Sequence, residues 1–369
     1  MKRPKIFQRR QDLEEVNVEM EVQGLSSISK KIKESVVGLT LPQVRYLVDS
    51  YYQMQECRVS LDNQARSLKQ GYDITVDGAK DAHPLAIQWV SSAFRNDEGQ
   101  IKKMLDIYTD SIPMGRYLKS VVGIGPVLAA GLLAYLNIDK VNHANQFISY
   151  AGLNDNNNPW LGKTGASALV KELKTMFPDE DPKKLSDDVF IEICRRTHRS
   201  FESVRVFSQV QEKNTHKRKG YTTWESLQKY LAMPPYNQNL KKLCFLIGES
   251  FVKVSGREDS LYGKLYRQRK AYETIKNEDL EYADQAAKIL QEKNICKSTD
   301  AYKAYSKGKL PKAHIQARAK RATVKIFLSH VFDAMYYEKY RIDPPNPYVL
   351  EYLGHEDEIY PEVDYKEFF

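Results

Sequence analysis

The sequence predicts a mainly α-helical protein, in which a long helical hairpin is followed by a helix-hairpin-helix domain and a basic C-terminal helical region. Three observations predict it. Before residue 110, apolar residues recur at helical spacing over two long stretches. The most apolar segment of the chain, Val121–Leu136, contains the turn signal Gly-Ile-Gly-Pro. Between Asp300 and Asp333 the chain has no acidic residue but eight lysines and arginines.

Composition limits the classes of partner and site. The 369 residues suffice for two or three units, and 56 Lys and Arg against 48 Asp and Glu leave a formal charge of +8, which favours a polyanionic partner. The cysteines are far apart and form no Cys-x-x-Cys pair, so we expect no zinc site, no disulfide framework, no cofactor and a reducing cytoplasm. They are Cys57, Cys194, Cys244 and Cys296. No apolar run reaches the roughly 20 residues of a membrane span, and no export signal is recognisable at the N-terminus.

Residues 1–40 are predicted to be a basic, poorly ordered tail with at most one weak strand at 16–22. From Leu41 the apolar period becomes helical until Gly71, and after the turn-rich stretch 71–83 a second helical stripe begins near Trp89. The range 41–110 is therefore expected to form an antiparallel helical hairpin, whose exposed seam would pair with a second copy to give a homo-oligomer. A plain helical subdomain without a partner is an equal alternative.

Residues 111–163 are predicted to contain a helix-hairpin-helix. Gly123, Ile124 and Gly125 form its turn, and Pro126 suits the first turn of the second helix, where a missing N–H costs nothing. Such a turn presents backbone N–H groups at a helix N-terminus and can hold a phosphate. Arg116 and Lys119 would add charge. The competing interpretation is a buried core hairpin without a ligand.

Residues 164–236 read as an inserted, polar, mainly helical block. The break at 197–200 between two helical stretches permits a helix-turn-helix over 186–210, but the spacing alone is a weak signal and favours a generic helical pair at least twofold. A basic cluster follows, which either contacts phosphates or is a solvated loop. Its members are Lys213, His216, Lys217, Arg218 and Lys219.

Residues 237–343 are predicted to be helical, ending in a basic helix from about Pro311 to Tyr340. One face of that helix carries His314, Arg318, Arg321 and Lys325. We favour phosphate binding over a merely solvated face, because no acidic residue is interspersed to form ion pairs within the helix. Residues 344–369 are expected to be an extended tail that wraps the surface.

The order of these motifs carries a resemblance to a known family. Gly-Ile-Gly-Pro with its Ala-rich helix is followed by Tyr150-Ala-Gly-Leu153, by Gly162-Lys163, by Asn239-Leu-Lys-Lys-Leu243, by Tyr262-Gly-Lys-Leu-Tyr266 and by the basic helix. Over roughly residues 40–340 this order resembles the C-terminal half of the IS-one-ten family of insertion-sequence transposases. The resemblance implies a DNA transposition protein, of which some relatives are guided by a structured RNA.

The chain departs from that family at both catalytic parts. The family has an N-terminal ribonuclease-H-like domain with an acidic metal site, for which the first forty residues are too short. The resemblance also implies a nucleophilic serine in the loop after the Ala-Gly-Leu helix, but the family's serine pair falls on Pro159 and Trp160 here. Neither side chain can attack a phosphate, so we expect a protein that binds without cutting.

The sequence thus predicts a transposase-like, nucleic-acid-binding protein of a mobile element or phage, accessory or catalytically degenerate, in the cytoplasm of a bacterial, archaeal or phage-infected cell. DNA is the expected ligand, with structured RNA as the other. The expected contacts are Gly123, Ile124, Gly125, Arg116, Lys119, Trp160, Lys163, Arg318, Arg321 and Lys325.

Two alternatives remain open. One is an active recombinase that uses Thr164, Ser167 or Ser149 as nucleophile, which would need activation by a base or cation. The other is an oligomeric helical scaffold. Trp160 is also a candidate for stacking on a base, whereas packing is the expected role of Tyr150.

Overall fold

The computed structural model describes residues 28–70, 85–154, 160–213, 215, 217–345 and 359–369. Within these ranges the regular elements are helices, and the only β-pairing is an isolated bridge between Gln211 and Arg218. The mainly α prediction is therefore confirmed. Several predicted features lie outside the described residues: the strand at 16–22, the turn at 71–83, the loop at 155–159, His216 and most of the tail.

The first described helix, α2 (Lys30–Val36), corrects the prediction of a tail up to residue 40 that held no helix. The Ser29 hydroxyl accepts a hydrogen bond from the Ile32 amide and caps its N-terminus. Val36 is buried in the main core. Capping and burial of one apolar side chain together explain why this short segment is helical.

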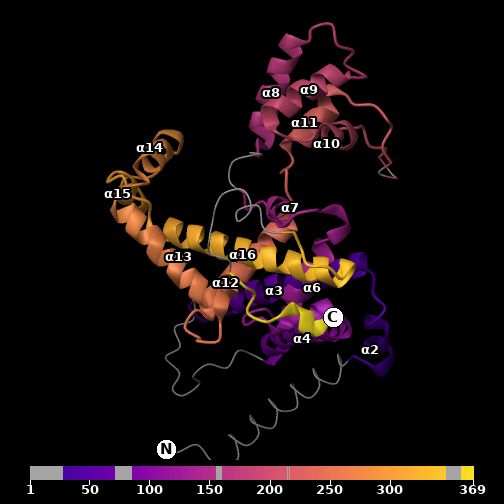
Figure 1. Cartoon of the computed structure of the whole chain (residues 1–369), viewed down its shortest axis with the longest axis vertical. Coiled ribbons are helices and arrows are strands. Elements are labelled where there is room, and N and C mark those ends of the chain that lie inside the picture. Colours follow the sequence, from indigo (N-terminus) through magenta and orange to yellow (C-terminus); the bar gives the residue numbers. More distant parts are fainter. Residues whose placement is uncertain (1–27, 71–84, 155–159, 214, 216, 346–358) are drawn as a thin grey trace, which may run out of the picture.

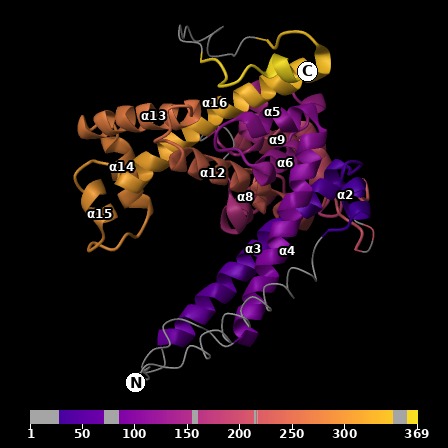
Figure 2. The same ribbon diagram turned by 90° about the horizontal axis from the view of Figure 1, so that it is seen from below.

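Helices α3 (Leu41–Gln70) and α4 (Leu85–Ser111) lie side by side and protrude from the body (Figure 2). Arg58 of α3 donates to Glu98 of α4 at 2.6 Å, while Ser91 donates to Asp62 at 2.7 Å. Later residues of α3 thus meet earlier residues of α4, which makes the pair antiparallel. The charge of Arg58, a polar residue of α3, is thus paired with that of Glu98.

The main core surrounds α6 (Pro126–Tyr135), which is buried along most of its length. Against it pack α3, α4, α5 (Pro113–Ser120) and α12 (Gln238–Lys253), and the short 3-10 turn η1 (Ile138–Lys140) follows it. Helix α16 (Lys312–Tyr340) packs in turn on α12, α7 (Ala144–Tyr150) and α13 (Leu261–Glu278). Gly131 of α6 allows the close approach of α12, because a Cβ there would lie 2.8 Å from Leu243. The helix that follows the Gly-Ile-Gly-Pro turn is therefore the centre of the fold.

Helices α8 (Gly162–Met176), α9 (Asp187–Thr197), α10 (Phe201–Phe207) and α11 (Trp224–Ala232) form a separate unit beside the body (Figure 1). They have their own apolar core, which includes Leu173, Ile193, Leu227 and Leu231. Buried Arg199 closes this unit, since its guanidinium donates to the carbonyls of Tyr230, Leu231 and Met233 at the end of α11.

Helices α13 and α16 run side by side toward α14 (Ala283–Glu292) and α15 (Asp300–Tyr305) at one end of the body (Figure 1). The described end of the tail, 359–369, packs on α5 through the 3-10 turn η2 (Tyr365–Phe368). There the rings of Tyr365 and Phe368 meet buried Tyr117 edge-on, with ring centroids 6.2 and 5.8 Å away. The C-terminal segment thereby covers the helix that leads into the turn.

Candidate nucleic-acid interface

The turn between α5 and α6 is a tight, braced structure. Gly123 has φ +99°, a conformation that glycine adopts without strain. The Ile124 amide donates to the Val121 carbonyl at 3.0 Å, and the Ser250 hydroxyl of α12 donates to the Gly123 carbonyl at 2.5 Å. Pro126 is the first residue of α6, as expected.

Of the three turn residues expected to donate to a phosphate, two keep their amides available. No described residue accepts a hydrogen bond from the Gly123 or Gly125 amide, nor from Val127 in the first turn of α6. Ile124 differs, because its amide is used inside the turn and its side chain is buried. The donors that remain lie in the turn and in the first turn of α6.

Glu362 of the C-terminal segment was not anticipated from the sequence. Its carboxylate accepts from the Val122 amide at 3.1 Å and from the Leu261 amide, at the start of α13, at 3.0 Å. Burial raises the pKa of this carboxyl above its usual value, although both amides oppose the shift. The Val122 amide, at the edge of the turn, thus already binds an acidic oxygen.

Arg116 and Lys119 of α5 are less free than the sequence suggested. The exposed Arg116 donates to the Asp110 carbonyl at 2.9 Å, near the end of α4. Lys119 forms ion pairs with Asp106 and Asp110 of α4. Burial lowers the pKa of Lys119, but both carboxylates outweigh it and the pKa is raised. Its charge is therefore balanced within the protein.

The cations of α16 have ion-pair partners that the sequence did not indicate. We expected no ion pairs within the helix, because no acidic residue is interspersed among its cations, but neighbouring helices supply carboxylates. On α16, Lys320 pairs with Glu249 of α12 and Arg318 with Glu273 of α13, and Lys309, which precedes α16, pairs with Glu278 of α13. Arg321 and Lys325, which are partly buried, also interact with other groups.

Arg318 belongs to a buried network rather than to an open surface. Glu273, which is 1% exposed, accepts from Arg318 at 2.6 Å, from Arg269 at 2.9 Å and from the Tyr282 hydroxyl at 2.6 Å. Burial would raise the pKa of Glu273, but the hydrogen bonds from Tyr282 and Arg318 hold it below its usual range. The guanidinium of Arg318 also lies over the Tyr282 ring.

Trp160, Tyr150 and Lys163 lie where the separate unit joins the body. Trp160 is 54% exposed, and its indole N–H donates to the Ala232 carbonyl at 2.8 Å. The Tyr150 hydroxyl accepts from the Asn237 side chain at 2.8 Å, so Tyr150 has a structural contact although its ring is half exposed. Lys163 is exposed on the first turn of α8, with no ion pair to any described residue.

The candidate hydroxyl nucleophiles lack a base. Thr164 and Ser167 are exposed on α8 and make no side-chain hydrogen bond to the described residues. The Ser149 hydroxyl accepts from Asn154 at 2.8 Å, which is an amide donor and not a base. None of the three is paired with a group that would remove its proton, which a hydroxyl nucleophile requires.

Two cations near the turn were missed by the sequence reasoning. Lys253 of α12 stands between Ser250 and Val254, which both contact Gly123, and Lys264 lies in the first turn of α13. Both are exposed, and within the described residues neither has an ion pair. No sequence signal could have found them, because they come near the turn only through the packing of α12 and α13.

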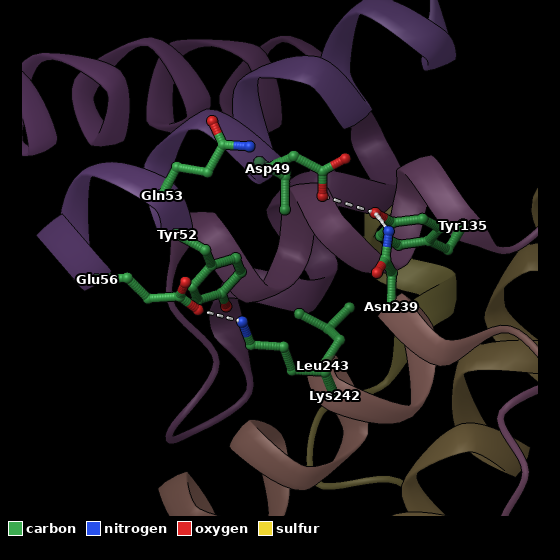
Figure 3. A pocket seen from close by; sticks show the side chains of 9 residues that line it. Asp49, Tyr52, Gln53, Glu56, Tyr135, Asn239, Lys242 and Leu243 are labelled. Carbon is green, nitrogen blue, oxygen red and sulfur yellow. Dashed lines mark hydrogen bonds and ion pairs between the residues drawn. The ribbon is translucent and has the colours of Figure 1, made fainter.

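A polar pocket of about 290 Å³ lies between α3, α6 and α12 (Figure 3). Tyr135 donates to Asp49 at 3.0 Å and accepts from Asn239 at 3.1 Å, and Lys242 pairs with Glu56 at 2.7 Å. Asp49 and Glu56 make its wall acidic, which disfavours a phosphate. We interpret it as a hydrogen-bonded seam between the helical pair and the body.

In the described part of the chain, three or more His, Cys, Asp or Glu side chains nowhere gather as a metal site. None of the described helices combines the length and apolarity that crossing a membrane requires.

Comparison with known proteins identifies one segment. Residues 115–159 match the family described as Transposase IS116/IS110/IS902. The match begins in α5, includes the turn, α6 and α7, and ends just before Trp160. Neither a curated protein nor a solved structure matches the chain. The resemblance inferred from the motifs is thereby confirmed over these residues.

Proposed function

We propose that this chain, whose residues 115–159 are transposase-like, is a nucleic-acid-binding protein. It binds a phosphate of DNA at the turn between α5 and α6. It acts as an accessory or catalytically degenerate protein of a mobile element or phage, in the cytoplasm of its host. Structured RNA is the other ligand of the same chemistry.

The observation that supports this proposal most is the set of available amides at the turn. Gly123 and Gly125 together with Val127 offer N–H groups at the N-terminus of α6, where the helix dipole favours an anion. Ser250 and Ile124 fix the turn, so these donors need little reorganisation on binding. The Glu362 carboxylate on the adjacent Val122 amide is one acidic oxygen that is bound at this edge.

Exposed cations flank the turn in this proposal. Arg116, Lys253 and Lys264 lie on the helices that frame it, and Lys163 and Trp160 lie at the junction with the separate unit. Arg321 and Lys325 remain proposed contacts on α16. Lys119 and Arg318 would act indirectly, by holding α4 to α5 and α13 to α16.

The chemistry of the described residues supports binding without cleavage. Trp160 cannot act as a nucleophile, and Thr164, Ser167 and Ser149 have no base beside them. The measurement is covalent trapping on a nicked DNA substrate. A protein–DNA adduct that Thr164→Ala abolishes would replace this proposal by an active recombinase.

The central test uses Gly125, the N-cap residue of α6. Its φ of −92° suits any residue, and a Cβ there would meet nothing within 4 Å. In Gly125→Asp the new carboxylate would accept from the first-turn amides, stabilising α6 by a few tenths of a kcal/mol. It would also place a negative charge where the phosphate binds, so we expect at least tenfold weaker DNA binding.

Gly125→Asn is the matched control, because it caps the same amides without a charge. Affinity is measured by fluorescence anisotropy of a labelled duplex across a salt series, and folding by thermal unfolding. We expect Gly125→Asn to weaken binding less than Gly125→Asp does. An unchanged affinity of a well-folded Gly125→Asp, or binding insensitive to salt, would contradict the phosphate grip.

A further inference from the structure

The charges of the separate unit are strongly polarised along its sequence. From Lys171 to Glu192 the chain carries seven acidic and four basic residues, whereas from Arg195 to Lys219 it carries two acidic and eight basic residues. The second range comprises the end of α9, α10 and the segment after α10. The second range, which is separate from the turn at Gly123, is therefore rich in cations, although Arg195 and Arg196 pair with Glu192 and Glu172, and Arg199 is buried.

The segment after α10 is a short antiparallel hairpin. Gln211 and Arg218 form a β-bridge, the Glu212 amide donates to the Lys217 carbonyl at 2.9 Å, and the Lys219 amide donates to the Val210 carbonyl at 3.0 Å. We call residues 210–213, 215 and 217–221 the basic hairpin. Its backbone bonds fix the spacing of the lysines it carries.

The basic hairpin is anchored to α10. The Arg218 guanidinium lies 4.3 Å from the centre of the Phe207 ring and donates to the Val206 carbonyl at 2.8 Å. At its base the buried hydroxyls of Ser208 and Thr222 share a hydrogen bond of 3.1 Å. The hairpin is thus held at the end of α10, so that both belong to one edge of the unit.

The lysines of this edge have no neutralising partner in the described part of the chain. Lys213, Lys217 and Lys219 are exposed, and no acidic side chain of the described residues forms an ion pair with them. The nearest acid in sequence, Glu212, accepts instead from Thr215 at 2.6 Å. This sets them apart from Lys320 and Lys309, which are paired with acids of neighbouring helices.

The order of α9, α10 and the basic hairpin is compatible with binding to a DNA duplex. Helix α9 and helix α10 are joined by a three-residue turn in which His198 has φ +54°, and the basic hairpin follows at once. In helix-turn-helix proteins the second helix enters the major groove of B-form DNA. The groove of A-form RNA is too deep and narrow for this. Exposed Arg205 of α10 would add a cation to the edge.

We propose that the edge formed by α10 and the basic hairpin is a second nucleic-acid contact, which binds the sugar-phosphate backbone of duplex DNA. The three unpaired lysines supply the attraction, and Arg218 positions them. This inference rests on the proposed function for the class of ligand, but it assigns a different surface and a duplex. An acidic protein partner is the competing occupant of such a surface.

The test compares two triple variants of the full chain with equal charge change. Lys213→Gln/Lys217→Gln/Lys219→Gln removes the lysines of the basic hairpin. Lys171→Gln/Lys183→Gln/Lys184→Gln removes three exposed lysines from the acidic range of the same unit. Binding of a 30-base-pair duplex is measured by anisotropy over a potassium chloride series, and thermal unfolding checks that both variants are folded.

We expect the hairpin variant to bind at least tenfold more weakly at low salt, and the slope of log affinity against log salt to fall by about 2 to 3, since each duplex phosphate contact contributes about 0.9. The control variant should keep the slope of the unaltered protein. Equal slopes for the two variants would overturn the proposal, as would equal loss of binding to duplex RNA. Competition by polyglutamate as effective as that by duplex DNA would instead assign the surface to an acidic protein.

The outcomes also separate this surface from the proposed grip at the turn. If Gly125→Asp loses DNA binding while the hairpin variant retains it, the inference fails and the proposed function stands. If the hairpin variant loses binding while Gly125→Asp retains it, phosphate binding at the turn fails and the contact at the basic hairpin stands. Absence of salt-dependent binding by the unaltered protein would overturn both.

Discussion

The Ser250 hydroxyl donates to the carbonyl oxygen of Gly123 at 2.5 Å, across 127 residues of sequence. The turn between α5 and α6 is therefore held by a helix that the chain forms much later. Ser250 and Val254 also bound the space beside Gly123, since a Cβ there would lie 3.3 Å from both. The shape of the turn is consequently a property of the packed core and not only of its glycines.

This relationship gives the first prediction. Gly123→Ala should destabilise the fold by about 1–2 kcal/mol, because φ +99° is strained for alanine and its Cβ crowds Ser250 and Val254. Gly125→Ala is the control, with ordinary backbone angles and open space, and should change stability by less than about 0.5 kcal/mol. Urea unfolding measures both. Similar effects of the two changes would contradict the described turn.

The second prediction is that alanine substitutions at two other glycines change the stability in opposite directions. Gly115→Ala should destabilise by more than about 3 kcal/mol, because its Cβ would lie 2.2 Å from the backbone oxygen of Thr109 and α5 would have to move. Gly99→Ala, inside α4 and with nothing within 4 Å, should stabilise by about 0.5–1 kcal/mol through helix propensity. Thermal unfolding distinguishes the two, and a harmless Gly115→Ala would show that α4 and α5 are not this close.

The Arg318–Glu273 pair gives a third prediction, on stability and pH. Arg318→Met should cost about 2 kcal/mol at neutral pH, somewhat less than the roughly 3–5 kcal/mol of a fully broken buried pair, because Arg269 still contacts Glu273. Arg257→Met is the control, since its pair with Asp259 is exposed and its loss should hardly change stability.

The pH dependence of that pair has a definite sign. The pKa of Glu273 is held below its usual value of 4.5, so the ionised carboxylate stabilises the folded state above that pH. This contribution is lost as the pH falls through the folded-state pKa. The stability difference between the unaltered protein and Arg318→Met should therefore shrink on acidification. A difference that grows in acid would contradict the pairing.

A fourth prediction concerns association of two copies through α3 and α4, which remains a proposal. Tyr46 of α3 is 71% exposed beside an apolar groove of about 430 Å³ that includes Leu47 and Met104. Tyr46→Glu should shift the protein from dimer to monomer in light scattering, without lowering its thermal stability. Ile191→Glu, at an exposed position of α9, is the control and should not change the oligomeric state.

The helices and the turn could be predicted because their signals are local. The apolar stripe of α3, the position of Pro126 and the period of α16 are each visible within one segment, and the structure places helices there. The ionic environment could not be predicted. Arg318 and Lys119 appear free in the sequence, yet their carboxylate partners come from other helices. Glu362 lies 240 residues after the amide it binds, so only the folded chain shows the contact.

The ends of the separate unit lie next to each other, as two hydrogen bonds show. Trp160 donates to the Ala232 carbonyl, and the Asn237 amide donates to the Tyr150 carbonyl at 2.9 Å. The chain therefore leaves the body and returns to it at nearly the same place, which is the geometry of an element grafted into a surface loop. The family match ends at residue 159, just before the separate unit begins. Replacing residues 161–232 with a short Gly-Ser linker should thus leave the main core intact.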